Sequence, residues 1–234
     1  MLKIDLHIHS INSGHAYGTI YNIFDEAKKK KMDMIAITDH GPSMEGTGSK
    51  AHFLIGTRRP QVPGLRILWG CEANVIGPNG EIDVEGIYID RLDIVLVNFH
   101  KYTGYEDQGI EKNTVAIIKA FQNPKIKVLA HPESPQYEYD FEKVCKVAVE
   151  NNVLLELNLA YLRLRGEERL EKFRRIVEIS KENNRKILIS SDAHFVHEIG
   201  DDSLLDQYRE KLGLTDDMII NNFPDELMEF LSIK

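Results

Sequence analysis

The sequence is poor in cysteine, in positive charge and in long apolar runs, and each shortage excludes a class of protein. Its 234 residues hold two cysteines, Cys71 and Cys145, which are far apart and form no motif, so a reduced, cytoplasmic protein is the simplest interpretation. The net charge of -8 argues against a broad basic surface for nucleic acid, although it allows a local basic pocket. No run approaches the roughly 18 apolar residues of a membrane span. The N-terminal residues lead directly into an expected strand, without a signal-peptide pattern.

What the chain does contain is a regular alternation of short apolar runs with amphipathic helical patterns. Thr19 and Asp140 stand where two of these helices should begin. This alternation predicts βαβ units with a parallel sheet, and no linker divides residues 1–234 into more than one domain. The strands fit either a barrel slightly smaller than the eight-stranded kind or an open doubly wound sheet. The predicted strands are Lys3–His7, Asp33–Thr38, Arg66–Ala73, Leu92–Phe99, Ile126–Ala130, Val153–Leu157 and Lys186–Ser190.

Residues that can bind metal gather where these strands end. His7 and His9 are two apart on the first strand, so both point to the same side. A single His-x-His is a weak signal, and a lone histidine is more often structural. Parallel α/β folds, however, bring the carboxyl ends of their strands to one rim, and the whole set together predicts a metal site there. The set is His7, His9, His15, His40, Glu72, His100, His131, Asp192 and His194.

Six ordered motifs resemble those of the PHP (polymerase and histidinol phosphatase) family. They are Asp-x-His-x-His-Ser from Asp5, Thr-Asp-His to His40, Gly-Cys-Glu-Ala-Asn around Glu72, Phe-His at His100, Ala-His-Pro at His131 and Ser-Asp-Ala-His to His194. The form of the third motif and the compact length are most similar to the YcdX-type phosphatases. The resemblance runs from Asp5 to about Gly200 and implies an α/β fold, a distorted seven-stranded (β/α)7 TIM-like barrel with a trinuclear metal site on its rim.

The resemblance also implies how the ligands divide among three divalent ions, for which Zn is favoured and Mn or Fe are alternatives. Glu72 is shared between the first two ions. The first ion is held by His7, His9, Glu72 and Asp192, the second by Glu72, His100 and His131, and the third by His15, His40 and His194. The first and last strands then become neighbours, because the barrel closes between them.

Such a centre predicts a phosphatase. Three divalent cations offset by two carboxylates leave a charge near +4, which suits a phosphate dianion. A hydroxide bridging two ions is the expected nucleophile for phosphomonoesters of a small metabolite. The alternatives are a phosphodiesterase or nucleotidase of the same family and, from another class, a metal-binding accessory protein. A dedicated nucleic-acid role is disfavoured, no membrane association is expected, and a homo-oligomer stays open.

Other residues are expected around the ligands. Asp5, on the face expected for His7, is predicted to orient an imidazole, and Asp39 is a weaker candidate for that role. Individually, each basic residue near the rim is more often a solvated surface charge. The candidates for holding phosphate are Lys101, Arg163 and Arg165, followed by Arg58 and Arg59; Tyr102, Tyr137 and Tyr161 are candidates for the pocket wall; His52 and His197 receive no metal role.

Overall fold

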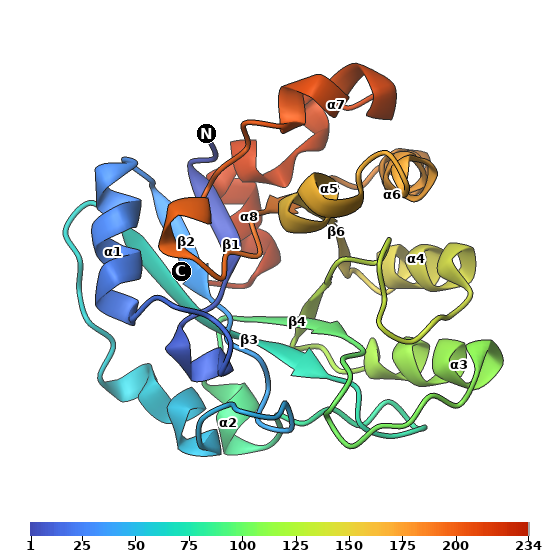
Figure 1. Ribbon diagram of the computed structural model, residues 1–234, viewed down its shortest axis with the longest axis horizontal. Coiled ribbons are helices and arrows are strands. Elements are labelled where there is room, and N and C mark those ends of the chain that lie inside the picture. The colour runs from blue at the N-terminus through green and yellow to red at the C-terminus, as the bar shows by residue number, and fades with distance from the viewer. Residues whose placement is uncertain (234) are drawn as a thin grey trace.

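A computed structural model describes residues 1–233 of the chain, apart from the side chains of residues 55–57. Within these residues, seven parallel strands follow one another in sequence order, each hydrogen-bonded to the next. They surround the middle of the molecule, with helices around them (Figure 1). All seven predicted strands are confirmed, with ends shifted by at most two residues. The strands are β1 (Ile4–Ile8), β2 (Met34–Ile37), β3 (Arg66–Asn74), β4 (Ile94–Asn98), β5 (Ile126–Leu129), β6 (Leu154–Asn158) and β7 (Leu188–Ser190).

The helices begin where the sequence places their caps. Thr19 accepts a hydrogen bond from the Asn22 amide in a reciprocal capping box, and Asp140 accepts one from Lys143. No helix of the described residues is long and apolar enough to span a bilayer. The α-helices are α1 (Ile20–Lys29), α2 (Ile87–Asp90), α3 (Ile110–Ala120), α4 (Phe141–Glu150), α5 (Leu159–Arg165), α6 (Leu170–Glu182), α7 (Leu205–Leu212) and α8 (Pro224–Phe230). Short 3₁₀ helices are η1 (Ile11–Ser13), η2 (Lys50–Thr57), η3 (Val196–Glu198), η4 (Asp216–Met218) and η5 (Ile220–Asn222).

The barrel interior is apolar at one end and polar at the other. Toward the amino ends of the strands, buried side chains such as Leu6, Leu96 and Val128 pack together, and α8 covers them with Leu227. Each fully buried leucine of this kind contributes about 1.5–3 kcal/mol. Toward the carboxyl ends of the strands, the side chains that face the barrel interior are polar, as at Glu72 and Asn98. The apolar end therefore forms a floor, and the chemistry-bearing residues lie above it.

The barrel closes between its first and last strands, which excludes the open doubly wound sheet. Ile8 and Ala193, just after β7, form a parallel bridge. The His9 amide donates to the Ala193 carbonyl at 2.9 Å, and the Ala193 amide donates to the His7 carbonyl at 3.3 Å. Closure places the opening His-x-His beside the closing Asp-x-His, as predicted.

Strand β1 carries an irregularity that decides where His7 points. Its register against β2 shifts between Asp5 and Ile8. Leu6 packs inside the barrel, whereas Ile8 packs in the outer cluster against α1, so Leu6 and His7 both face inward. The Thr38 hydroxyl completes the interrupted ladder by accepting the Ile8 amide at 3.1 Å. Asp5 consequently lies on the opposite face from His7.

Replacing Thr38 by Val should destabilise the protein, because the buried Ile8 amide then loses its acceptor. We expect the free energy of unfolding in urea to fall by about 1–2 kcal/mol. The Thr38→Ser variant keeps the hydroxyl and serves as the control. Equal stabilities of Thr38→Val and the unchanged protein would contradict this account of the bulge.

Candidate metal centre

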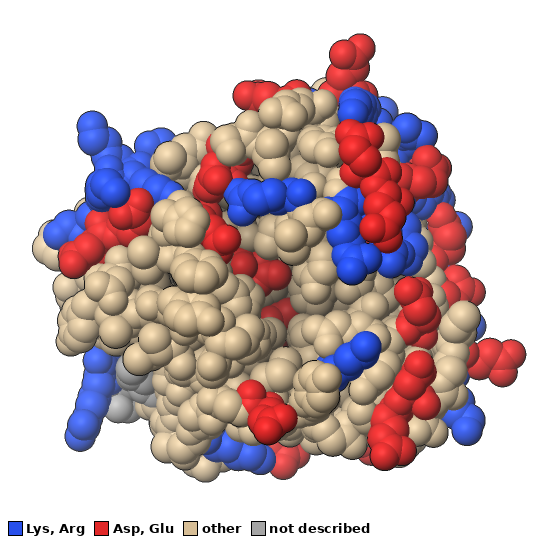
Figure 2. All heavy atoms as spheres, viewed as in Figure 1, with Lys and Arg blue, Asp and Glu red and all other residues tan. Residues whose placement is uncertain are grey.

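The polar end of the barrel brings the nine predicted ligands together. Figure 2 shows this face hollowed near its centre, with acidic side chains at the floor of the hollow. Glu72, on β3, is completely buried at the middle of the group. Of the others, His194 is half-buried and His15 is exposed. The remaining buried ligands are His7, His9, His40, His100, His131 and Asp192.

A first set of atoms converges on one oxygen of Glu72. Its Oε2 lies 3.2 Å from His7 Nε2 and 3.4 Å from His9 Nε2. Asp192 Oδ1 lies 3.4 and 3.1 Å from the same two nitrogens. All four atoms are buried, and none makes a hydrogen bond within the described residues. Since an unpartnered buried polar atom costs about 1–3 kcal/mol, four that face one another fit a shared cation.

A second set gathers around the other oxygen. Glu72 Oε1 lies 2.8 Å from His131 Nε2 and 3.2 Å from His100 Nε2. The two imidazole nitrogens are 3.4 Å apart. Glu72 thus has one oxygen in each set, which is the arrangement of a bridging carboxylate.

A third set lies toward the mouth. Nitrogens of His9, His40 and His194 lie within 4.8 Å of one another. His40 also places Nδ1 2.8 Å from Glu72 Oε2. The exposed ring of His15 stacks on His40 and His194, with centroids 5.0 and 4.9 Å away. His9 is thus close to two sets, and the membership of His15 in the third set stays a prediction.

Two of the predicted ligands have a strained backbone. His131 has φ of 30° and Asp192 has φ of 53°, a region that side chains other than glycine rarely adopt. Glu156 Oε2 accepts the His131 amide at 2.6 Å and holds this conformation. Such strain persists where the surroundings fix it, and it is common at functional sites.

The outward-facing nitrogen of several histidines has its own partner. His7 Nδ1 lies 2.7 Å from Glu156, His9 Nδ1 lies 2.9 Å from Ser13, and His100 Nδ1 lies 2.7 Å from Asn74. These contacts aim each Nε2 into the centre. The sequence did not identify these roles. Glu156 was visible as a carboxylate at a strand end, but its spacing cannot show that it faces His7.

Asp39 reaches the predicted ligand His9 through a serine, and its role in orienting an imidazole stays a prediction. Its buried carboxylate accepts the Ser13 hydroxyl at 2.7 Å, and Ser13 contacts His9. His52 Nε2 lies 3.0 Å from the same carboxylate. Burial opposes ionisation of Asp39, but the hydrogen bonds from His52 and Ser13 outweigh it and hold its pKa at about 2.

Asp5 does not orient an imidazole, and the prediction for it is wrong. Its carboxylate accepts the backbone amides of Gly200 at 2.8 Å, Ser191 at 3.1 Å and His7 at 3.4 Å. The bulge in β1 is the reason, because it places Asp5 and His7 on opposite faces. Asp5 instead fixes the chain at the barrel seam.

The carboxylates control the charge of the histidines. Burial lowers the pKa of His9, but the adjacent carboxylates of Asp192 and Glu72 raise it to about 8. Burial likewise opposes protonation of His131, but Glu72 raises its pKa to about 9. Conversely, burial would raise the pKa of Glu72, yet the histidines His100 and His7 hold it well below its usual range. Burial instead lowers the pKa of His40 to about 3 and that of His194 to about 4, so without a cation the centre combines carboxylates with protonated His9 and His131 and neutral His40 and His194.

The structure separates the basic residues predicted to hold phosphate. Lys101 and Arg165 line one cavity of about 270 Å³ together with Tyr161, whose ring centroid is 5.2 Å from that of His131. Arg163 is absent from that lining, and its guanidinium pairs with Asp201 at 2.8 Å. Arg58 lines a different cavity, and Arg59 pairs with Asp93 at 2.5 Å. Of the tyrosines predicted for the pocket wall, Tyr161 lines the cavity of Lys101 and Arg165, Tyr102 lines the neighbouring cavity of His15 and His40, and Tyr137 lines neither.

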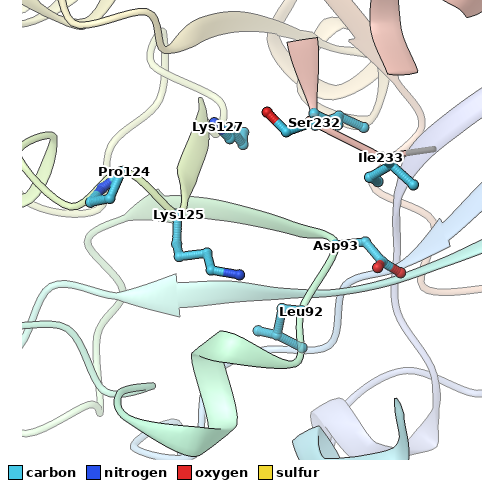
Figure 3. A pocket seen from close by; sticks show the side chains of 8 residues that line it. Leu92, Asp93, Pro124, Lys125, Lys127, Ser232 and Ile233 are labelled. Carbon is cyan, nitrogen blue, oxygen red and sulfur yellow. The ribbon is translucent and has the colours of Figure 1, made fainter. Parts of the chain in front are cut away.

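A larger cavity of about 530 Å³ lies away from the centre, at the amino ends of β4 and β5 (Figure 3). Lys125 and Asp93 face it, and no histidine lines it. None of the nine predicted ligands lines it, so it is separate from the candidate metal centre.

Comparisons with known proteins agree with the sequence motifs. Residues 5–218 match the family model described as the PHP domain. A protein named "Probable phosphatase" from Syntrophotalea carbinolica is 32% identical over 232 residues, covering 99% of this chain and 96% of the relative. Another of that name, from Acetivibrio thermocellus, is 35% identical over 235 residues, covering 99% and 95%.

Two solved structures share the fold at low sequence identity. Histidinol phosphate phosphatase from Lactococcus lactis, complexed with Zn, L-histidinol and phosphate, has a TM-score of 0.60 at 14% identity, covering 90% of this chain and 92% of that chain. A chain of archaeal ribonuclease P with mature tRNA has a TM-score of 0.52 at 18% identity, covering 97% and 93%. At these identities the likeness concerns the fold alone.

The Glu156→Gln variant should bind metal more weakly, because an uncharged amide holds the His7 imidazole less firmly. We expect the affinity for Zn²⁺, measured by chelator competition, to fall by about ten- to a hundredfold. Glu138→Gln, at an exposed position, is the matched control. Unchanged affinity in Glu156→Gln would show that this contact does not orient the ligand.

The stability of metal-depleted protein should depend on pH. The folded pKa values of His9 (about 8) and His131 (about 9) lie above the ordinary 6.5. Their protonated forms therefore stabilise the fold fully below pH 6.5, and this stabilisation is lost as the pH rises through 8 and 9. The Tm of chelator-treated protein should fall across that window, whereas metal-loaded protein, with neutral imidazoles, should not show this loss. Parallel Tm profiles of the two forms would contradict the expectation.

Proposed function

Because the chain belongs to the PHP domain family and is a phosphoric monoester hydrolase, we propose that its rim holds three divalent cations that act on a small phosphorylated metabolite. The observation that supports the metal centre most directly is the convergence of unpartnered buried atoms. His7 Nε2, His9 Nε2 and His40 Nδ1 face Glu72 Oε2 in the barrel interior. A metal cation accepts electron pairs from imidazole nitrogens and carboxylate oxygens at the same point, so it would satisfy all of these atoms together.

The donor set also favours a type of metal. It consists of imidazoles with two carboxylates and no thiolate, which suits Zn and also Mn or Fe. The Lactococcus lactis histidinol phosphate phosphatase is complexed with Zn, so Zn is the first ion to test. We propose the division of ligands as follows: His7, His9, Glu72 and Asp192; Glu72, His100 and His131; and His15, His40 and His194.

The bound cations would lower the pKa of water and neutralise the charge of a phosphate group. The protein's own contribution is to hold their ligands rigidly. Glu156, Ser13 and Asn74 fix the imidazole rings, and the apolar floor keeps water out from below. At the mouth, the Lys101 ammonium draws phosphate toward the rim, since it lines the cavity that contains His15 and His40.

A phosphomonoester substrate agrees better with the comparisons than a phosphodiester. The curated relatives that cover the whole chain carry the name phosphatase. The likeness to a ribonuclease P chain is a likeness of fold at 18% identity and carries no activity with it. The phosphatase is therefore the function that we propose.

Metal-loaded protein should hydrolyse p-nitrophenyl phosphate and retain about 2–3 equivalents of metal per chain. The lower number is expected if the two ions that share Glu72 are bound more tightly than the third. Chelation should abolish turnover. The His100→Ala variant should lose metal and lower kcat by about a hundredfold or more while keeping the circular dichroism spectrum of the barrel.

The control for this test is His197→Ala. His197 is exposed and belongs to none of the three sets, so its loss should change neither metal content nor turnover. Full activity of protein that measurably contains no metal would overturn the proposed function.

A further inference from the structure

Beside the metal centre lies a cavity whose charge is opposite to that of the whole chain. Its volume is about 270 Å³, and three of its lining residues are cations, whereas none is a carboxylate; the chain carries -8. We call it the distal anion pocket. Its lining residues are Lys101, Ser134, Pro135, Gln136, Tyr161, Arg165 and Arg169.

We propose that the distal anion pocket binds a second phosphate group of the substrate, so that the substrate class is a bisphosphorylated small metabolite. This rests on the proposed function, in which the metal centre takes the phosphate that is cleaved. The second phosphate is bound but does not react.

The first argument is that the pocket contains donors without partners. Within the described residues, no ion pair or hydrogen bond is formed by the Lys101 ammonium. The buried hydroxyl of Ser134 makes no hydrogen bond there, and neither does the buried Nε of Arg169, from which the Glu168 carboxylate is 3.5 Å away. Buried donors are normally satisfied, so these two, next to the exposed and unpaired Lys101 ammonium, indicate an acceptor from outside the chain.

The second argument is that the charge of the pocket is hardly neutralised by the protein. Glu168 is the carboxylate next to the two arginines, 3.3 Å from Arg165 and 3.5 Å from Arg169 Nε. It is 61% exposed, so water screens it. One exposed carboxylate shared by two guanidinium groups, with Lys101 unpaired, leaves a surplus of two positive charges.

The third argument is position. Tyr161 lines the pocket and packs against His131, so the pocket begins one aromatic ring away from the metal ligands. Lys101 and Gln136 also line the neighbouring cavity that holds His15 and His40. The backbone amide of Lys101 donates a hydrogen bond to Gln136 Oε1 at 2.8 Å, and these two residues form a wall that the two cavities share. A single small molecule therefore reaches both places.

The chemistry of the pocket selects phosphate over carboxylate. Two guanidinium groups, an ammonium and a hydroxyl offer many donors from several directions, which suits a tetrahedral dianion. A carboxylate carries one charge and presents two coplanar oxygens, so it would leave donors unmet. In Figure 2, Lys and Arg side chains lie beside the central hollow, on the side where α6 runs in Figure 1.

The test uses metal-loaded enzyme and matched pairs of α,ω-alkanediol monophosphates and bisphosphates of increasing chain length. We expect kcat/KM for the best bisphosphate to exceed that of its monophosphate by about tenfold or more, mainly through a lower KM. Arg165→Gln and Arg169→Gln should each bring that ratio close to one. Arg165 is about half exposed, so its replacement is compatible with folding even if the Arg169 variant is unstable.

Arg174→Gln is the matched control, because Arg174 lies on α6 outside the pocket and pairs with Glu171. It should keep the full preference for bisphosphates. Equal kcat/KM for the two members of every pair would overturn the inference, as would a preference that survives both pocket variants. A stronger preference for ω-phosphorylated carboxylic acids of matched length would overturn the assignment to phosphate.

The two proposals fail in different ways. Metal-loaded enzyme that cleaves neither monophosphates nor bisphosphates contradicts the proposed function itself. Enzyme that cleaves monophosphates and shows no preference for a second phosphate contradicts the distal anion pocket alone.

Discussion

The structure depends on the burial of one carboxylate. Glu72 has no exposure to solvent, and its two oxygens are surrounded by imidazole nitrogens within 3.4 Å. A charge in such a place is tolerated only when other charges or cations meet it. The bulge that turns His7 inward, the strained backbone of His131 and Asp192 and the seam beside Ala193 all serve to bring partners to this carboxylate. The apolar floor below keeps the surroundings dry, which strengthens each contact.

Much of this arrangement could be predicted from the sequence, because the apolar runs of parallel strands and the polar residues at their carboxyl ends can be recognised directly in the sequence. The position of a histidine at a strand's carboxyl end needs no tertiary information. The prediction for Asp5 was wrong because a one-residue bulge in β1 reverses the face on which every earlier residue of the strand lies. No local sequence signal marks this bulge. Glu156, Ser13 and Asn74 could not be assigned because their partners lie on other segments, and only the register between strands decides which imidazole each one meets.

The basic residues show a different limit. Arg163 and Arg165 are two apart at the end of α5, so a helix turns them to different sides, and one pairs with Asp201 while the other lines the pocket. Arg169 continues one turn beyond Arg165, with its amide bonded to the Arg165 carbonyl at 2.8 Å. The four-residue helical spacing would have predicted that Arg165 and Arg169 lie on the same side of the helix and that Arg163 lies on another. The net charge of -8 disfavours the binding of long polyanions, whereas the basic lining of the pocket is compatible with a small anion.

The seam of the barrel has a consequence for how the protein is made. His7 and His9 lie near the start of the chain, and Asp192 and His194 follow almost 190 positions later. These four residues nevertheless face the same cluster. A ribosome therefore releases the last ligands long after the first, and Ile8 cannot bond to Ala193 until both have left the exit tunnel. The complete set of predicted ligands therefore comes together only after the last strand has been made. A truncated product that ends before β7 lacks the closing strand and two of the predicted ligands, Asp192 and His194, so it can form neither the seam nor the complete set.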